Sequence, residues 1–132
     1  MNSISTSAFV AVFGGAGVGA TLRWVFALWL NPLFPTVPLG TLAANLLGGL
    51  LVGMASAFFA QHSELAPEWR LLAVTGFLGG LTTFSTFSAE VVHLIGRQQP
   101  GWALATAGVH LVGSLVLTGI GIALSQALMS RA

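Results

Sequence analysis

The chain has 132 residues, of which 55% are hydrophobic and only 5% are charged. Because soluble domains carry roughly 25% charged residues, this composition excludes a water-soluble fold and indicates an integral membrane protein. The net charge of +1 comes from four Arg and three Glu, which excludes the clustered basic surface of a nucleic-acid-binding protein. Cysteine is absent, which excludes disulfides and thiolate metal sites.

Four stretches are long enough to cross a membrane, since about 20 apolar helical residues span the hydrocarbon core. They are Phe9–Leu30, Pro38–Ala60, Leu71–Ile95 and Trp102–Leu128. The first follows no basic segment and exceeds the roughly 7–15 apolar residues of a signal peptide, so we interpret it as a retained span. The sequence therefore predicts an all-α membrane protein with a single four-span domain over residues 1–132.

In the first span, Gly15 and Gly19 lie four residues apart, a spacing that lets membrane helices pack closely. Arg23 continues this spacing and so lies on the same helix face. Intramembrane charge is costly and points to a role. Two roles stay open for Arg23: it keeps an aqueous vestibule positive, or it makes a structural bond to another helix.

The second span has a face that is first polar and then small. Thr41 and Asn45 lie four residues apart, and Gly49 and Gly53 continue the line. The Asn45 amide can donate two hydrogen bonds. It either lines a polar passage or bonds to a neighbouring helix, a contact typically worth about 0.6–2 kcal/mol.

The centre of the third span consists of residues that weaken a helix. From Gly76 to Glu90 it reads GFLGGLTTFSTFSAE, with adjacent glycines, threonines and repeated hydroxyls. We predict a helix break, which a membrane tolerates only where the freed backbone faces protein or a water-filled cavity. The alternative is a continuous helix whose hydroxyls bond to their own turns. If two copies cross at a break, carbonyls from both could hold a bare Na⁺.

Phe84 and Phe87 share one face of this span and alternate with hydroxyl residues, which is unusual for a lipid-facing surface. An aromatic ring has a positive edge, so ring edges and hydroxyls together favour an anion without a full charge. Packing against other helices is the alternative. Glu90 follows on the same stretch and is either protonated, ionised beside water, or a partner in an interhelical bond.

The fourth span carries one polar line across an otherwise apolar helix. Its members recur every four residues: Thr106, His110, Ser114 and Thr118. Such regular spacing places all of them on one face, which indicates a shared polar surface rather than isolated packing residues.

The few Arg residues do not specify one membrane orientation, which normally follows excess Lys and Arg on the cytoplasmic side. Arg70 and Arg131 belong to one side, and Arg97 and Arg23 belong to the other. This balance favours a mixture of both orientations, and the alternative is that one orientation wins through other effects. Four helices cannot bury all these polar stripes alone, so we also expect an oligomer.

Three stretches resemble the signatures of the Fluc/CrcB fluoride channel family. They are Gly14–Gly17 with Gly19, Ala20 and Arg23; Gly40–Asn45 with Gly48; and Gly79–Phe87, which reads GGLTTFSTF. The likeness covers essentially the whole chain, and the last run is highly specific. The resemblance implies a dual-topology homodimer of antiparallel subunits with two pores, placed in membrane lipid of the bacterial inner membrane, through which fluoride leaves the cell passively.

The resemblance also implies roles for residues. Backbone carbonyls at Gly79 and Thr82 would hold a structural Na⁺ at the dimer centre, as a bound cofactor that is not transported. The fluoride pore would be lined by Asn45, Phe84, Phe87, Thr41, Ser85, Thr86, Ser114 and Thr118. For Arg23 and Glu90 the vestibule role comes from the cost of intramembrane charge and not from the resemblance. His110 departs from the small polar residue expected at its position and receives no firm role.

Two other classes of function stay open. A small multidrug exporter can also be a four-span dual-topology dimer, but it needs a membrane carboxylate that the first span lacks. A non-transporting membrane subunit would use the polar stripes to contact partner helices. An enzyme is not expected, because His62, His93 and His110 show no metal-ligand spacing.

Overall fold

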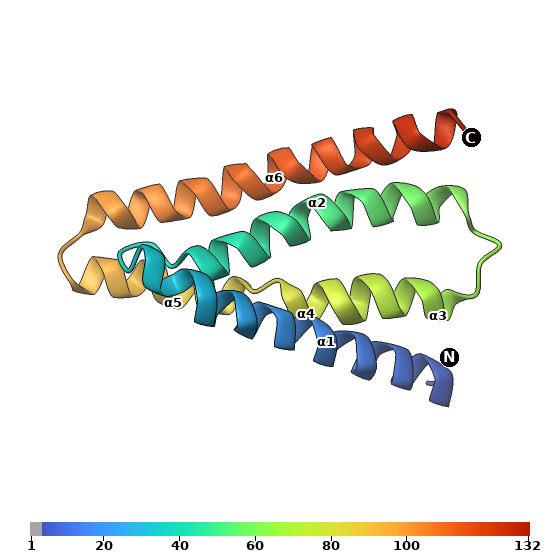
Figure 1. Cartoon of the computed structure of the whole chain (residues 1–132), viewed down its shortest axis with the longest axis horizontal. Coiled ribbons are helices and arrows are strands. Elements are labelled where there is room, and N and C mark those ends of the chain that lie inside the picture. The colour runs from blue at the N-terminus through green and yellow to red at the C-terminus, as the bar shows by residue number, and fades with distance from the viewer. Residues whose placement is uncertain (1–3) are drawn as a thin grey trace.

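The computed structural model describes residues 4–132 and consists of four long helical stretches that run alternately up and down (Figure 1). Both ends of the described chain and the connection from α2 to α3 lie at one end of the molecule, and the other two connections lie at the opposite end. The elements are α1 (Thr6–Leu30), η1 (Asn31–Leu33), α2 (Leu39–Gln61), α3 (Pro67–Arg70), η2 (Leu71–Leu78), α4 (Gly79–Leu81), α5 (Phe84–Gly96) and α6 (Pro100–Ser130).

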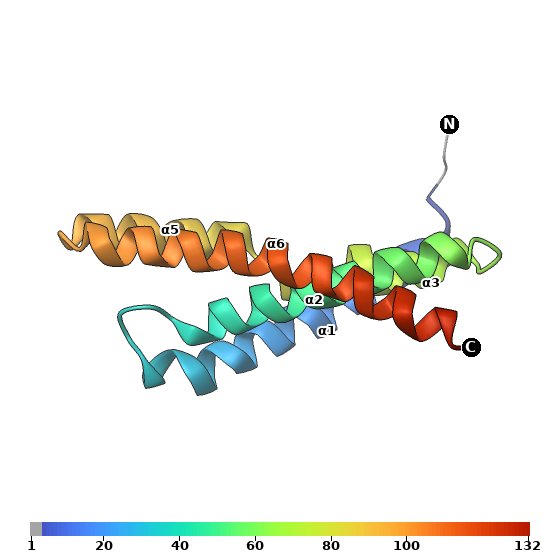
Figure 2. The ribbon, with the colours of Figure 1, turned by 90° about the horizontal axis from the view of Figure 1, so that it is seen from above.

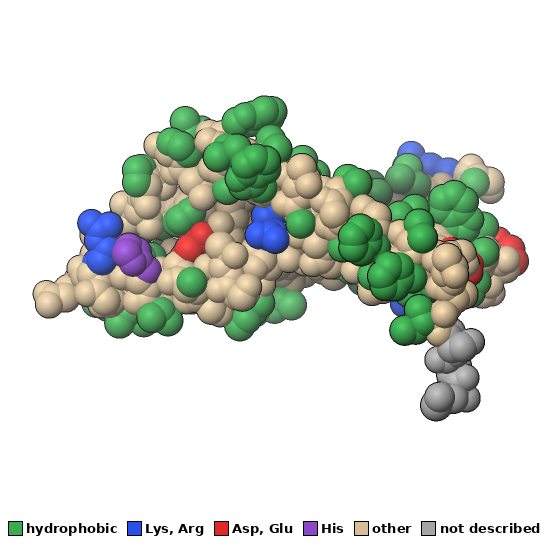
Figure 3. All heavy atoms as spheres, turned by 90° about the horizontal axis from the view of Figure 1, so that it is seen from below, with side chains coloured by type: hydrophobic (Ala, Val, Ile, Leu, Met, Phe, Trp, Pro, Cys, Tyr) green, Lys and Arg blue, Asp and Glu red, His purple; other side chains and the backbone are tan. Residues whose placement is uncertain are grey.

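The four predicted spans are confirmed. Helical stretches over Thr6–Leu33, Leu39–Gln61, Pro67–Gly96 and Pro100–Ser130 are each long and apolar enough to cross a membrane. Three of them begin earlier than expected, at Thr6, Pro67 and Pro100. The two prolines each occupy the start of a helix, where a missing amide proton costs nothing. On the face seen from below, hydrophobic side chains are distributed along the length of the molecule, with few charged groups among them (Figure 3).

The third span is broken near its centre, as predicted. Thr82 and Thr83 have extended backbones, with φ of −87° and −152° and ψ of 153° and 119°, between α4 and α5. The Thr83 hydroxyl accepts the Thr86 amide proton at 3.2 Å and so caps the start of α5. Before the break, η2 is a wide helix of the π type, a form that often marks functional sites.

The glycine pairs show which helices approach closely. An added Cβ at Gly19 would meet the Phe77 carbonyl, so α1 lies against η2; one at Gly53 would meet the Thr118 carbonyl, so α2 lies against α6. Small residues at these crossings allow the backbones themselves to touch. Both glycine pairs are therefore used for packing within one chain.

In the view from above, the connection between α1 and α2 diverges from the α5–α6 pair (Figure 2).

A small apolar core joins α2 to the third span. Ala44 and Leu81 are fully buried, and Leu78 lies beside them. This core holds one side of the break against α2, so part of the irregular backbone is covered by protein.

Candidate functional site

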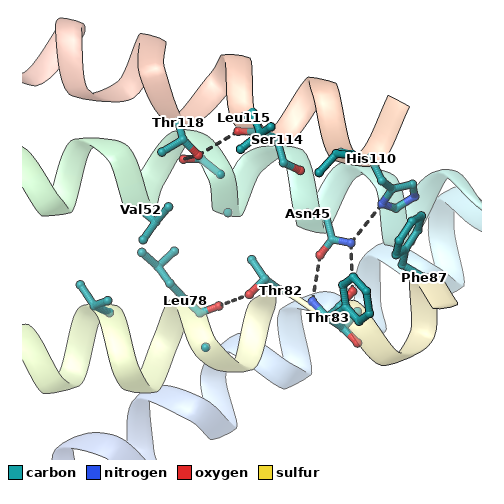
Figure 4. Close-up of a pocket in the computed structure, with 16 residues that line it drawn as sticks. Asn45, Val52, Leu78, Thr82, Thr83, Phe87, His110, Ser114, Leu115 and Thr118 are labelled. Carbon is teal, nitrogen blue, oxygen red and sulfur yellow. Dashed lines mark hydrogen bonds between the residues drawn. The ribbon is translucent and has the colours of Figure 1, made fainter. Parts of the chain in front are cut away.

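An open groove of about 510 Å³ lies beside the break, between α2, the third span and α6 (Figure 4). Eight residues predicted for the site lie along it: Asn45, Gly79, Thr82, Phe84, Phe87, His110, Ser114 and Thr118. Within residues 4–132, no Asp, Glu, Lys or Arg side chain lines this groove. The groove is therefore largely apolar, with hydroxyl, amide, imidazole and aromatic groups placed along it.

Asn45 connects α2 to the break through the backbone of Thr83. Its Oδ1 accepts the Thr83 amide proton at 2.8 Å, and its Nδ2 donates to the Thr83 carbonyl at 3.0 Å. A backbone amide only donates and a carbonyl only accepts, so these two bonds fix which way the side-chain amide points. In this arrangement Asn45 makes an interhelical bond, one of its two expected uses, and contact with an ion stays a prediction.

The orientation of Asn45 determines the protonation of His110. Its Nδ2 also lies 3.1 Å from Nδ1 of His110. Because Nδ2 carries only donor protons, Nδ1 must accept, and the single proton of the neutral ring is on Nε2. His110 is 4% exposed, and its Nε2 has no hydrogen-bond partner in the described part of the chain.

Glu90, on α5, is bound by Thr41 of α2. The Thr41 hydroxyl donates to Glu90 Oε1 at 2.5 Å, while Oε2 is buried without a partner among residues 4–132. Thr41 precedes Asn45 by one helical turn, so the two polar contacts of α2 are stacked along one face. Glu90 thus makes an interhelical bond, one of the alternatives expected for it, and neither Thr41 nor Glu90 lines the groove.

The two phenylalanines form an edge-to-face pair at the start of α5. The Phe84 and Phe87 ring centroids are 5.6 Å apart with planes at 67°, and Phe87 also lies 4.6 Å from the His110 ring. Phe84 is 78% exposed in the chain. Both rings line the groove near the N-terminal, positive end of α5.

The hydroxyl groups fall into two sets. On α6, the Thr118 hydroxyl lies between the Ser114 and Gly49 carbonyls at 2.8 and 3.0 Å, while the Ser114 hydroxyl makes no bond within the described residues. On α5, Ser85 and Thr86 gather around the Thr83 hydroxyl at 3.2 Å. The first set lines the groove and the second caps the helix.

The break frees two backbone carbonyls at the positions predicted for a cation. In a continuous helix the Thr83 and Thr86 amides would donate to the Gly79 and Thr82 carbonyls. Here they donate to Asn45 Oδ1 and to the Thr83 hydroxyl instead. Neutral oxygens released in this way are suitable ligands for a bare Na⁺. The two residues therefore fit the expected cation.

Arg23 reaches the same break from α1. Its Nε donates to the Gly80 carbonyl at 3.1 Å, so a third freed carbonyl is bound within the subunit. This is the interhelical bond that was one of the two expected roles of Arg23. The guanidinium of Arg23 also lies near the C-terminal end of the helix before the break, and this negative end of a helix favours a cation.

Thr83 is the important residue that the sequence reasoning did not single out. It supplies the two backbone groups held by Asn45 and the hydroxyl that caps α5. Its signal was a threonine three residues before Thr86, directly after paired glycines, which is the pattern of a helix start.

Four apolar spans, with an uncharged and largely apolar groove at a helix break, define a multi-pass membrane protein. Comparison with known proteins identifies the family. Residues 9–122 match the family described as CrcB-like protein, Camphor Resistance (CrcB), and the chain belongs to this family.

Two relatives carry the name Fluoride-specific ion channel FluC. That of Burkholderia pseudomallei (strain 668) is 54% identical and that of Burkholderia cenocepacia is 55% identical, each over 123 residues. Both alignments cover 93% of this chain and 96% of the relative. The family resemblance is confirmed, and so is the prediction that the chain is not an enzyme, because these relatives are ion channels.

Proposed function

We propose that the chain is a fluoride-selective channel that lets fluoride leave a bacterial cell passively across its inner membrane. Relatives at 54% and 55% identity with that name support the ion. The observation that carries the proposal is the groove, whose described lining offers hydroxyls and ring edges without any fixed charge.

The physical argument starts from fluoride, which is small, strongly hydrated and a strong hydrogen-bond acceptor. A selective pore must replace its water, yet it must bind weakly enough to release the ion. The free Ser114 hydroxyl and the edges of Phe84 and Phe87 provide such neutral contacts along one groove. In acidic surroundings neutral HF enters a cell and dissociates, so a passive exit for the anion would relieve toxicity.

The functional unit would be a homodimer of antiparallel subunits with two pores. Its support is the open side of the groove and the exposed Phe84 ring, which a second copy would cover. The even distribution of Arg between the two sides supports mixed orientations.

A sodium ion at the dimer centre would be held by the carbonyls of Gly79 and Thr82 from each copy. Gly79 is exposed, and an added Cβ there would have its nearest neighbour 3.6 Å away, so a partner backbone has room to approach. The cation would join the two breaks through neutral oxygens and would not be transported. This chain's own contribution is to release those oxygens by bonding Asn45 and Thr83 to the competing amides.

The test is efflux of fluoride, and separately of chloride, from liposomes that contain the purified protein and Na⁺. We expect fluoride efflux, little chloride efflux, and loss of activity when Na⁺ is replaced by N-methylglucamine. Phe84→Ile should reduce fluoride efflux by about tenfold, the rate equivalent of roughly 1.4 kcal/mol, which lies at the upper end of measured aromatic interactions.

Phe9→Ile is the matched control, because Phe9 is an exposed ring on α1, outside the groove. Absence of fluoride efflux from folded protein in Na⁺ would refute the channel. Unchanged efflux in Phe84→Ile would show that the ring is not needed for fluoride passage. Efflux without Na⁺ would show that the cation is not needed.

A further inference from the structure

His110 can hold Asn45 only in one protonation state. Its Nδ1 accepts from Asn45 Nδ2 over 3.1 Å, as the fixed orientation of Asn45 requires. A protonated imidazole carries a hydrogen on both nitrogens. Two donors would then face each other across this contact, and the bond would be lost.

Asn45 cannot turn over to restore the bond without losing others. A reversed amide would offer Oδ1 to His110, but it would place two donors together at the Thr83 amide and two acceptors, Oδ1 and the Thr83 carbonyl, against each other. Both bonds to Thr83, now 2.8 and 3.0 Å long, would break. The His110 contact and the Asn45–Thr83 contact are therefore compatible only when the imidazole is neutral.

We propose that His110 is a positioning residue for Asn45 and acts only as the neutral imidazole, so that proton uptake loosens Thr83 and lowers anion passage. The effect on passage rests on the proposed channel function. The effect on Thr83 does not, because it follows from the hydrogen bonds alone. Fluoride passage would then depend on pH even though no fixed charge lines the groove within the described residues.

Few other groups can titrate near His110. It lies on α6, which packs against α2 and α5. Residues 39–61 of α2 contain no Asp, Glu, Lys, Arg or His, and His110 is the one such residue in α6. α5 contributes Glu90, bound to Thr41, and His93, which is exposed. Phe87 covers the imidazole with a tilted ring at 4.6 Å, and an aromatic face tolerates a cation.

Three measurements test the proposal between about pH 8 and about pH 5, the interval in which an imidazole usually changes charge. Nitrogen NMR of wild-type protein at the higher pH should show a neutral ring with its proton on Nε2. Protection of the Thr83 amide proton, taken relative to the intrinsic exchange rate at each pH, should decrease on acidification. Fluoride efflux, corrected for HF leakage through protein-free liposomes, should fall by about tenfold, a size typical of one lost hydrogen bond.

His110→Asn is the matched variant, because its side-chain oxygen can accept from Asn45 but cannot titrate. In this variant we expect that acidification no longer changes the protection of the Thr83 amide or lowers fluoride efflux. Glu90→Gln should keep the pH response, which separates the two titratable residues. His110→Gln repeats the test should His110→Asn fail to fold.

A proton on Nδ1 at the higher pH, or an acid response that persists in His110→Asn, would overturn the proposal. A wild-type protein with no fluoride efflux at any pH would refute the channel function alone. The Thr83 exchange experiment would still decide whether His110 controls Asn45.

Discussion

The side-chain amide of Asn45 pairs with the peptide of Thr83 much as a neighbouring β-strand would. One bond of 2.8 Å runs from the Thr83 amide to Oδ1, and another of 3.0 Å runs from Nδ2 to the Thr83 carbonyl. Extended backbone inside a membrane normally leaves both groups unpaired, which costs several kcal/mol per group. A single side chain from α2 therefore makes the helix break tolerable.

Asn45→Ala should destabilise the protein by about 1–3 kcal/mol, because it leaves buried backbone groups of Thr83 without partners. The Thr83 amide proton should also exchange faster. Unfolding in mild detergent and hydrogen exchange measure the two effects. Ser56→Ala is the control, since Ser56 is exposed on the same helix. Equal stability of the two variants would mean that water replaces the Asn45 bonds.

Thr41→Val should cost about 1–3 kcal/mol of folding stability, because it keeps the shape of the side chain but removes the hydroxyl that donates to Glu90. Thr41→Ser keeps the donor and should retain most of the stability. Thermal unfolding of the two variants in the same detergent makes the comparison. If both lost the same amount, the methyl group of Thr41 rather than its hydroxyl would be responsible.

Gly121→Ala should destabilise the α2–α6 packing by about 1–3 kcal/mol, the usual cost of overfilling a tight contact. An added Cβ at Gly121 would meet the backbone of Leu50 and Met54, whereas at Gly119, on the same helix, it would meet nothing within 4 Å. Gly119→Ala should therefore be neutral or slightly stabilising, since Ala favours helix by up to about 1 kcal/mol. Comparable losses in both would indicate that Gly119 faces a second copy.

Ser63→Cys should report the orientation of the chain in the membrane. Cysteine is otherwise absent, and Ser63 is exposed in the connection between α2 and α3. With mixed orientations, a membrane-impermeant thiol reagent applied outside sealed cells should label about half of the protein, because the Arg distribution favours neither side. Labelling of all or none of it would establish a single orientation.

The spans and the break could be predicted from sequence because both depend on local composition. Apolar length is sufficient for a span, and the glycines before Thr82 weaken any helix. The partners across the break could not be predicted in the same way. A four-residue spacing placed Asn45 and His110 on faces of their helices, but only packing of those helices brings Nδ2 and Nδ1 within 3.1 Å.

The glycine pairs illustrate the same limit. Their spacing indicated close approach of some helix to α1 and to α2 without naming it. The structure gives η2 as the neighbour of Gly19 and α6 as the neighbour of Gly53. For Arg23, the cost of a charge in the membrane indicated a role but not a partner. The partner is the Gly80 carbonyl, which is free to accept only because the third span is interrupted.

An even number of crossings brings the start of α1 and the end of α6 to the same end of the molecule (Figure 1). Two copies fused head to tail through a flexible polar linker would therefore point the same way in the bilayer. A single gene for an oppositely directed pair would need one extra hydrophobic helix between the halves. Whether a tandem fusion conducts ions would therefore depend on whether the segment that joins the two copies crosses the membrane.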